Sequence, residues 1–244
     1  MPLNKNFFDL ELCYDGTCNL ACSICRQDIL KLNDTQKNKI SLIEKKVLNT
    51  DFNLFNSILT SGFGEPFASK SYMKILKSLD TLKTPNLKII IYTNGQLFNE
   101  KNWNELANIK HRIDKVYVSI HAVKKETYRK ICRADFDKLL VNLEFIADLK
   151  KSGFIKNIIY NFVVMRANLY EMADFITFAR NNNVDKIIFL QLGDWNCLDY
   201  EEYMKEAVQF QNHPEHNKLI GILQAPIFRE SDVSLGYFSR FLDK

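Results

Sequence analysis

The sequence has no apolar run that approaches the roughly 18 residues of a membrane-spanning helix. Its start, Met-Pro-Leu-Asn-Lys-Asn, lacks the apolar core of a signal peptide. Glycine and proline are scarce, with 8 and 5 residues among 244, which excludes collagen-like and low-complexity chains. A large excess of charge of one sign is also lacking, because the net charge is only +4. We therefore expect a globular cytoplasmic protein with no membrane segment and no strong signal for nucleic-acid binding.

Cysteine is the residue type that needs an explanation. The chain holds 6 cysteines, and Cys18, Cys22 and Cys25 lie close together in one short stretch. Structural disulfides are rare in cytoplasmic proteins, and a chain of this length buries enough surface to fold without them. We expect Cys13 to lie in the core, and Cys132 and Cys197 to be free buried thiols.

Short β-rich runs alternate with helical patterns along the chain. The β-rich runs cover residues 7–14, 54–60, 87–93, 115–120, 157–165 and 186–192, and the helical patterns lie near 35–48, 69–82, 99–109, 124–151 and 169–182. Strands that are each followed by a helix predict a parallel sheet with helices outside it. Six such units do not complete the eight of a full barrel. We expect an α/β fold, a partial (β/α)6 TIM-like barrel with one open side.

The end of the chain differs from the repeating part. We assign residues 1–198 to the core domain and residues 199–244 to a C-terminal extension with a sparse helical pattern. Because the extension carries many apolar residues, we expect it to cover the open side of the partial barrel.

Chemistry-bearing residues follow the predicted strands, where parallel α/β folds gather their functional groups. The residues at these strand ends are Cys18, Cys22 and Cys25, then Gly62, Phe63, Gly64, Glu65 and Pro66, then Thr93 and Asn94, then Ser119 and His121, then Arg166 and Asn168, and finally Gln191. The pattern predicts that all of them surround one mouth of the fold.

The cysteine loop has the spacing Cys-x3-Cys-x2-Cys, from Cys18 to Cys25. Thiolates are soft ligands that suit zinc or iron–sulfur clusters. Structural zinc takes four ligands, usually as two separated pairs, and a second pair is missing from the sequence. Three thiolates in one loop would hold three irons of a [4Fe–4S] cluster and leave the fourth open to a small molecule.

The loop resembles the signature of the radical S-adenosylmethionine (radical SAM) superfamily, and the resemblance extends over about residues 7–195. The run from Gly62 to Pro66 is similar to the Gly-Gly-Glu-Pro motif of that family, in the form Gly-x-Gly-Glu-Pro. Tyr92-Thr93-Asn94-Gly95 resembles the usual end of the next strand. Val118-Ser119-Ile120-His121 resembles the ribose-motif strand, with histidine in place of the frequent aspartate, and Arg133 resembles the arginine that often follows it.

The resemblance implies a radical SAM enzyme with one [4Fe–4S] cluster and S-adenosylmethionine as cofactors. Cys18, Cys22 and Cys25 would hold the cluster, and the catalytic residues that contact the substrate stay unknown. Arg133 would pair with the methionyl carboxylate, and Glu65 would support its loop or the methionyl ammonium. The full set of implied S-adenosylmethionine contacts is Ile24, Gly62, Phe63, Gly64, Glu65, Pro66, Thr93, Asn94, Ser119, Arg133, Arg166, Asn168 and Gln191.

The reaction implied by the resemblance is reductive cleavage of S-adenosylmethionine. The resulting 5′-deoxyadenosyl radical would abstract hydrogen from an unidentified substrate, either glycan-related or a small metabolite. An electron donor such as flavodoxin or ferredoxin would supply the electron. Two alternatives remain from the residues alone: an iron–sulfur protein that transfers electrons or binds a partner without radical catalysis, and a structural zinc protein.

Overall fold

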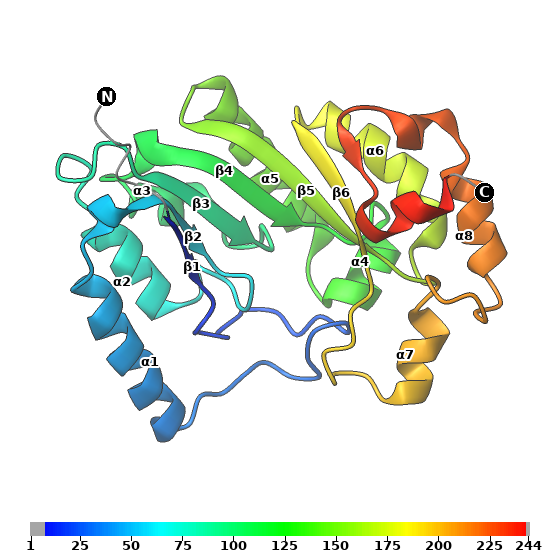
Figure 1. Cartoon of the computed structure of the whole chain (residues 1–244), viewed down its shortest axis with the longest axis horizontal. Helices are drawn as coiled ribbons and strands as arrows, with labels where there is room; N and C mark the ends of the chain where they lie inside the picture. Colours follow the sequence, from blue (N-terminus) through cyan, green and yellow to red (C-terminus); the bar gives the residue numbers. More distant parts are fainter. Residues whose placement is uncertain (1–7, 243–244) are drawn as a thin grey trace. The chain divides into compact units, whose positions relative to one another are not determined.

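The computed structural model describes residues 8–242, in which strands and helices alternate along the chain (Figure 1). Its strands are β1 (Phe8–Leu12), β2 (Phe55–Thr60), β3 (Lys88–Thr93), β4 (Ile113–Ser119), β5 (Ile155–Val164), β6 (Lys186–Gln191) and β7 (Val233–Ser234). They form a seven-stranded sheet in the order β1-β2-β3-β4-β5-β6-β7. Strands β1 and β2, β2 and β3, β5 and β6, and β6 and β7 pair in parallel. Because the order is linear, hydrogen bonds do not close the sheet into a barrel.

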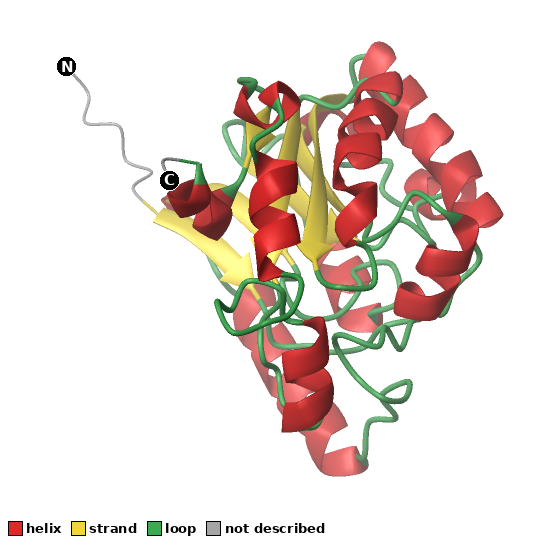
Figure 2. Cartoon of the chain, turned by 90° about the vertical axis from the view of Figure 1, so that its right-hand side faces the viewer, coloured by secondary structure: helices red, strands yellow, loops and turns green. Residues whose placement is uncertain are grey.

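Helices separate most of the strands in the sequence, and Figure 2 shows them (red) packed outside the strands (yellow). They are α1 (Asp34–Leu48), α2 (Lys70–Ser78), α3 (Glu100–Asn104), α4 (Lys125–Cys132), α5 (Phe136–Lys151), α6 (Met172–Asn181), α7 (Tyr200–Glu206) and α8 (His216–Leu223). The expected α/β fold, a partial TIM-like barrel, is confirmed. Across residues 8–242, every helix is too short or too polar to span a membrane.

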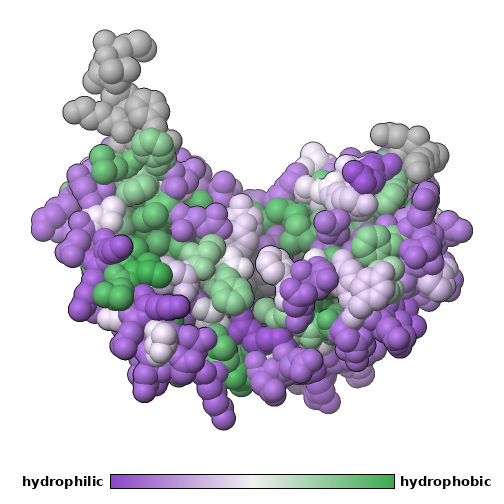
Figure 3. All heavy atoms as spheres, turned by 60° about the horizontal axis from the view of Figure 1, so that its bottom comes forward, coloured by the Kyte–Doolittle hydropathy of each residue, from purple (hydrophilic) through white to green (hydrophobic). Residues whose placement is uncertain are grey.

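The chain forms two compact units. Of the described residues, unit 1 contains 8–19, 30–117 and 142–157, and unit 2 contains 20–29, 118–141 and 158–242. The predicted boundary between residues 198 and 199 lies inside unit 2. Hydrophilic side chains (purple) cover much of the face seen in Figure 3, with apolar ones (green) among them, as on most globular proteins.

Unit 1 is built on β2, β3 and the helix between them. Ile58 of β2 and Ile91 of β3 are fully buried, as is Tyr72 of α2, followed on the same helix face by Ile75 and Leu76. The spacing of three and four residues presents one apolar stripe of α2 to the sheet. Helix α1 packs against α2 (Figure 1). These contacts fix the carboxyl ends of β2 and β3, where the candidate site residues lie.

Unit 2 has an aromatic core between β5, β6 and α6. The ring of Phe162 lies 4.7 Å from that of Phe175 and 5.6 Å from that of Phe189. The ring of Phe228, in the chain after α8, lies 5.7 Å from that of Phe189. Each of these large aromatic side chains buries a large apolar area.

The C-terminal extension folds as part of unit 2. Val233 and Ser234 of β7 pair with Ile187 and Ile188 of β6, so the extension adds a seventh strand to the sheet. Arg180 of α6 forms ion pairs with Glu230 and Asp232, which precede β7, and each N–O distance is 2.8 Å. The sequence did not predict this strand, because a two-residue pairing carries no periodic pattern. Its expected role as a cover of the open side stays a prediction.

Two expected elements have different limits. The helical pattern over 124–151 is broken between α4 and α5, because Arg133 adopts a left-handed conformation with φ of 53°. The strand expected over 7–14 ends at Leu12, because the Tyr14 hydroxyl bonds to Ser71 Oγ (2.7 Å) and the Asp15 N–H donates to the Tyr72 hydroxyl (2.9 Å). Residue Phe7 lies outside the described residues.

Docking of the extension can be tested at Phe228, whose side chain is 2% exposed. We expect Phe228→Ala to lower the free energy of unfolding by about 3–5 kcal/mol, because it opens a cavity against the aromatic core. Urea unfolding of the full chain measures the change. The exposed neighbour Ser231→Ala is the control and should change stability by about 0.5 kcal/mol or less. Equal stability of the Phe228→Ala and Ser231→Ala variants would show that the extension is not packed on the rest of unit 2.

Candidate functional site

The three clustered cysteines lie in the loop that follows β1. Cys18 belongs to unit 1, whereas Cys22 and Cys25 belong to unit 2. All three are half-buried and outside any disulfide, and the Cys25 N–H donates to the Cys22 carbonyl at 2.9 Å in a tight turn. Within residues 8–242, no group of three or more His, Cys, Asp or Glu side chains is arranged to hold a metal ion. The ligand set for a cluster therefore stays a prediction.

Nitrogen donors contact the sulfur atoms of Cys18 and Cys25. Asn94 Nδ2 lies 3.6 Å from Cys18 Sγ, within unit 1. Arg26 Nη2 lies 3.6 Å from Cys25 Sγ, within unit 2. Hydrogen bonds to sulfur stabilise the thiolate form and are typical of cysteines that hold iron–sulfur clusters.

The Cys22 thiol instead donates to the Cys132 carbonyl oxygen, at a distance of 3.8 Å. A hydrogen bond from the Cys132 side chain lowers the pKa of Cys22, burial opposes this, and the charges of Arg26 and Arg133 lower the pKa further. The same contact, together with burial, raises the pKa of Cys132 well above its usual value. A loop of three thiols outside any disulfide, with nitrogen donors at two of the sulfurs, fits the chemistry of an iron–sulfur cluster.

In unit 1, the Gly-x-Gly-Glu-Pro loop lies directly against the start of the cysteine loop. Gly64 has a φ of 109°, and a Cβ atom there would lie 2.4 Å from the Asp15 carbonyl and 2.9 Å from that of Thr17. Only glycine fits this close backbone approach. Gly62 differs, because a Cβ atom there would meet Cys13 Sγ at an ordinary 3.4 Å.

The Glu65 carboxylate is fully buried. It accepts hydrogen bonds from the Asn94 N–H at 2.7 Å, from Thr93 Oγ1 at 2.9 Å and from the Phe67 N–H at 3.3 Å. Burial raises its pKa to about 7, although these donors lower it. Of the two roles expected for Glu65, these contacts favour support of the loop.

The sequence analysis missed an anchor around Asp15. The buried Asp15 carboxylate accepts hydrogen bonds from Thr17 N at 2.9 Å and from Ser69 Oγ at 2.5 Å. Ser69 also caps the N-terminus of α2 through the Tyr72 N–H. A serine before a helical pattern is a local signal for an N-cap, and it could have pointed to Ser69. The bond from Ser69 to Asp15 joins residues 54 positions apart, so no sequence pattern indicates it.

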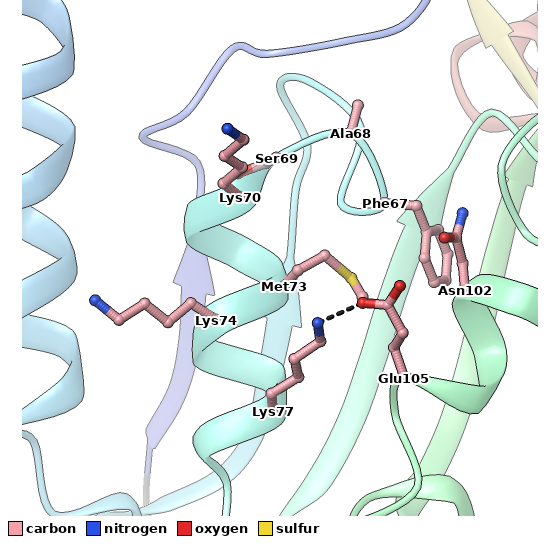
Figure 4. A pocket seen from close by; sticks show the side chains of 9 residues that line it. All are labelled: Phe67, Ala68, Ser69, Lys70, Met73, Lys74, Lys77, Asn102 and Glu105. Carbon is pink, nitrogen blue, oxygen red and sulfur yellow. Dashed lines mark hydrogen bonds and ion pairs between the residues drawn. The ribbon is translucent and has the colours of Figure 1, made fainter.

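A cavity of 480 Å³ in unit 1 lies between α2 and α3 (Figure 4). Its lining residues are Phe67, Ala68, Ser69, Lys70, Met73, Lys74, Lys77, Asn102 and Glu105. Lys77 and Glu105 form an ion pair across it. It contains none of the predicted site residues, and we do not assign it to the candidate site.

In unit 2, Asn168 and His121 join the ends of β4 and β5. Asn168 Nδ2 donates to the carbonyls of His121 (2.8 Å) and Val163 (2.9 Å), and its Oδ1 accepts from the Met165 N–H (2.8 Å). These bonds favour a structural role for Asn168 over the expected cofactor contact. His121 Nδ1 accepts from the Val163 N–H at 3.2 Å, and burial lowers the His121 pKa to about 4. The imidazole is therefore neutral at neutral pH.

A second cavity, of 740 Å³, lies wholly in unit 2 beside the cysteine loop. It brings together Arg133 and Arg166, which are far apart in the sequence. Arg133 Nη1 donates to the Gln27 carbonyl at 2.6 Å, and Arg166 Nη2 lies 3.8 Å from Glu206 Oε1. The other lining residues are Ser23, Asp28, Lys130, Ile131, Met165, Ala167, Cys197, Leu198, Glu202 and Lys205.

The remaining predicted contacts are distributed over both units. In unit 1, Pro66 and Thr93 are buried and Phe63 is exposed; in unit 2, Ile24 and Ser119 are half-buried and Gln191 is exposed. The structure does not by itself assign a cofactor contact to these six residues.

The expectation for Cys13 is wrong. Its side chain is exposed, with its thiol donating to Glu11 Oε1 at 3.3 Å and its sulfur accepting from the Gly62 N–H at 3.4 Å. The chain leaves the sheet directly before Cys13, so the residue escapes the core. Cys132 is buried as expected, whereas Cys197 is only half-buried and contacts the Cys25 carbonyl.

The fold and the loop of three thiols define a parallel α/β protein with a candidate iron–sulfur site. The radical SAM superfamily matches residues 16–179, about two thirds of the chain. The chain belongs to the radical SAM superfamily, as the sequence resemblance predicted. This is a superfamily of enzymes.

Two curated relatives are named as probable GTP 3′,8-cyclases. A probable GTP 3′,8-cyclase of Saccharolobus islandicus is 29% identical over 188 residues, which cover 75% of this chain and 56% of the relative. A probable GTP 3′,8-cyclase of Sulfurisphaera tokodaii is 25% identical over 208 residues, which cover 82% of this chain and 62% of the relative. The chain thus spans little more than half the length of these relatives.

Solved structures resemble the fold over nearly the whole chain. Streptococcus suis SuiB, bound to its precursor peptide SuiA, has a TM-score of 0.60 at 15% identity, covering 94% of this chain and 49% of that chain. The protein anSMEcpe with bound AdoMet has a TM-score of 0.56 at 19% identity, covering 95% of this chain and 64% of that chain. At this identity the likeness supports the fold alone.

The buried His121 predicts a pH dependence of stability. Its pKa is lowered from 6.5 to about 4 in the folded protein, so between these values only the unfolded chain binds the proton. Stability from this residue is complete above about pH 6.5 and is lost as the pH falls toward about 4, by up to roughly 3 kcal/mol. The raised pKa of Glu65 makes stability change with pH in the opposite direction. The pH dependence of the wild-type stability therefore does not by itself report on His121.

We expect the stability difference between the wild type and His121→Gln to grow by roughly 3 kcal/mol from pH 4 to pH 6.5. Glutamine keeps an acceptor for the Val163 N–H but does not titrate. Anaerobic urea unfolding at several pH values measures the difference, with the exposed His111→Gln as control. A pH-independent difference for His121→Gln would show that His121 is accessible to protons in the folded state.

Proposed function

We propose that the chain is a radical SAM enzyme that binds a [4Fe–4S] cluster through Cys18, Cys22 and Cys25. The cluster would supply the electron that cleaves S-adenosylmethionine to methionine and a 5′-deoxyadenosyl radical, which takes hydrogen from a substrate. The observation that carries the proposal is the loop of three thiols outside any disulfide, with nitrogen donors at Cys18 and Cys25, in a chain of this superfamily.

Protein groups in unit 1 would hold the loop against which the cofactor binds. Gly64 permits the close approach of its loop to Asp15 and Thr17. The Glu65 carboxylate fixes Thr93 and the backbone of Asn94. We infer that Glu65 acts as a positioning residue, because its hydrogen bonds go to the protein itself.

The cavity of unit 2 suits the methionyl part of S-adenosylmethionine, which carries both an ammonium and a carboxylate. Its lining has both signs of charge, with Arg133 and Arg166 able to pair with the carboxylate. The acidic side chains Asp28 and Glu202 line the same cavity. Gly62, Phe63, Pro66, Ile24, Ser119 and Gln191 stay predicted contacts of the cofactor.

GTP is the first substrate to test, because the curated relatives are probable GTP 3′,8-cyclases. The chain covers little more than half of those relatives, so their activity is a candidate and not an assignment. A reduced flavodoxin or ferredoxin is the class of electron donor we propose, since the reaction needs one electron at low potential. Failure to consume GTP would leave the proposed cleavage of S-adenosylmethionine in place.

The proposal predicts iron uptake and formation of 5′-deoxyadenosine. After anaerobic reconstitution, we expect a [4Fe–4S] spectrum and, on reduction with S-adenosylmethionine, 5′-deoxyadenosine detectable by chromatography. Cys18→Ala, Cys22→Ala and Cys25→Ala should each lose the spectrum and the product, because each removes a ligand. Cys13→Ala is the matched control and should keep both.

Other results would favour other functions. A stable cluster without 5′-deoxyadenosine would favour an electron-transfer or binding protein. A colourless protein that binds zinc and takes up no sulfide would favour a structural zinc site. Retention of the cluster in all three loop variants would refute the ligand assignment.

Arg133 gives a prediction about S-adenosylmethionine binding that is separate from the assignment of the cluster ligands. We expect Arg133→Ala to keep the cluster and to weaken S-adenosylmethionine binding by about ten- to a hundred-fold, the effect of losing a charge-assisted hydrogen bond of roughly 1.5–3 kcal/mol. Equilibrium binding to the reconstituted protein measures it. Arg129→Ala, an exposed arginine on the same helix, is the control. Equal affinity of the two variants would remove Arg133 from the cofactor site.

A further inference from the structure

Helices α1 and α2 of unit 1 concentrate the positive charge of the chain. Their lysines outnumber their two acidic residues, Asp34 and Glu44, by five, so these helices have a net charge of +5 where the whole chain has only +4. All of these lysines are exposed. They are Lys37, Lys39, Lys45, Lys46, Lys70, Lys74 and Lys77. Together with the exposed apolar residues Leu42 and Ile43 of α1, we call them the basic surface.

One face of α1 combines lysines with apolar side chains. Leu42 is 61% exposed and Ile43 is 38% exposed. They lie between Lys39 and Lys46, at the spacing of three, four and seven residues that places side chains on one face of a helix. Val47 is the buried residue of this helix. Exposed apolar side chains between charged ones are typical of a contact surface for another protein.

Helix α2 continues the basic surface. Lys70, Lys74 and Lys77 follow one another at the spacing of four and three residues, and Figure 4 shows Lys74 extending toward α1 and Lys77 toward Glu105. Lys74 pairs with Glu44 of α1 and so joins the two helices. The side chains of Lys74 and Lys77 remain 60% and 44% exposed in their ion pairs. An ammonium group has three donors, so both lysines can contact a further acidic group.

The start of α2 is tied to the cysteine loop within unit 1. Ser69, directly before Lys70, donates to the Asp15 carboxylate at 2.5 Å, and this carboxylate also accepts from the Thr17 N–H at 2.9 Å. Cys18 is the next residue. Because the three residues from Asp15 to Cys18 span no more than about 11 Å, the basic surface begins close to the first thiol of the loop.

We propose that the basic surface of α1 and α2 is the docking site of an acidic electron-carrier protein, a flavodoxin or ferredoxin of net negative charge. This inference rests on the proposed function, which needs an external one-electron donor. The carrier loses one electron and is oxidised, the site in the cysteine loop gains it and is reduced, and no bond forms or breaks. Electron-carrier complexes bury little area, so two apolar side chains among lysines suit such a contact.

The residue types favour a protein partner over a nucleic acid. Arginine is the residue of choice for phosphate and nucleic-acid recognition, and unpaired bases stack on aromatic side chains. Helices α1 and α2 contain no arginine, and their one aromatic residue, Tyr72, is fully buried. Lysines around an apolar centre suit instead an acidic protein, which the charges steer into place and the apolar side chains contact.

Substitutions on the basic surface leave the proposed cofactor contacts unchanged. Lys39→Glu/Lys46→Glu reverses the two lysines beside the apolar pair, and Leu42→Ser removes the more exposed apolar side chain. Lys124→Glu/Lys138→Glu is the matched control, because it makes the same change in net charge at two exposed lysines of unit 2. Thermal unfolding of each full chain checks that the fold is kept.

Each protein is reconstituted anaerobically and reduced either with dithionite or with a flavodoxin of net negative charge, and 5′-deoxyadenosine is measured. With dithionite, which needs no docking surface, we expect every variant to match the wild type. With flavodoxin at low salt, Lys39→Glu/Lys46→Glu should lower kcat/KM for flavodoxin by about ten-fold or more. The loss should shrink at high salt, because ions screen the charges. The control should match the wild type.

Leu42→Ser tests the apolar part of the basic surface. It should lower kcat/KM for flavodoxin at both low and high salt, because apolar contact is not screened by ions. Binding of oxidised flavodoxin, measured by isothermal titration calorimetry, gives a second readout that does not depend on activity. Its Kd should rise in Lys39→Glu/Lys46→Glu and in Leu42→Ser and should stay at the wild-type value in the control.

The failures of this inference and of the proposed function are distinguishable. If Lys39→Glu/Lys46→Glu and the control use flavodoxin equally well, while dithionite still yields 5′-deoxyadenosine, only the inference is overturned. Loss of the dithionite-driven product in Lys39→Glu/Lys46→Glu also overturns it, because the substitutions would then disturb the site itself. A short DNA duplex that binds the wild type but not this variant, with flavodoxin use unchanged, would make the basic surface a nucleic-acid site. A wild type that forms no product with either reductant overturns both.

Discussion

The buried carboxylate of Glu65 is the interaction on which the arrangement of unit 1 depends. Its own N–H donates to the Thr17 carbonyl at 2.8 Å, and its side chain accepts from the Asn94 N–H at 2.7 Å. The Asn94 side chain in turn contacts Cys18 Sγ and Asn19 Oδ1. Two strand ends and the start of the cysteine loop are thus joined through one side chain. A carboxylate placed without water is costly to ionise, and only the surrounding donors make this position tolerable.

The same principle of buried polar groups with full hydrogen bonding organises unit 2. Asn168 joins the ends of β4 and β5 through its amide, and the neutral His121 accepts a backbone N–H beside it. The carboxylate of Glu171 accepts from the N–H groups of Val123 and Lys124, where α4 begins. These contacts place the C-terminal end of α4, with Cys132 and Arg133, next to the turn that carries Cys22. Residues that look functional by type are in part the structural support of the site.

The cysteine loop combines two kinds of environment. The sulfur of Cys18 has an amide donor and that of Cys25 has a guanidinium donor, whereas the Cys22 thiol itself donates to the Cys132 carbonyl. Donors of different strength and exposure at the three positions would make the sulfurs inequivalent toward one bound group.

Sequence alone determined the alternation of strands and helices, the α/β class and the superfamily, because these depend on local periodicity and on spacings within one loop. It also singled out Gly64, whose loop approaches the backbone of Asp15 and Thr17 closely in the structure. Tertiary structure alone decided the rest. The bond from Asp15 to Ser69 and the contact of Cys22 with Cys132 join residues that are far apart in the sequence, and the two-residue β7 is a strand only because β6 pairs with it.

Three differences between the sequence predictions and the structure each have a single physical cause. The helix predicted across residue 133 is broken by one left-handed backbone conformation, which no periodic pattern reveals. Cys13 is exposed because the chain leaves the sheet to bond with α2. Asn168 is a structural residue because backbone groups of distant strands occupy its amide. Local sequence fixes which groups are available, and long-range packing decides which partners they have, since hydrogen-bond partners depend on three-dimensional proximity and not on spacing in the chain.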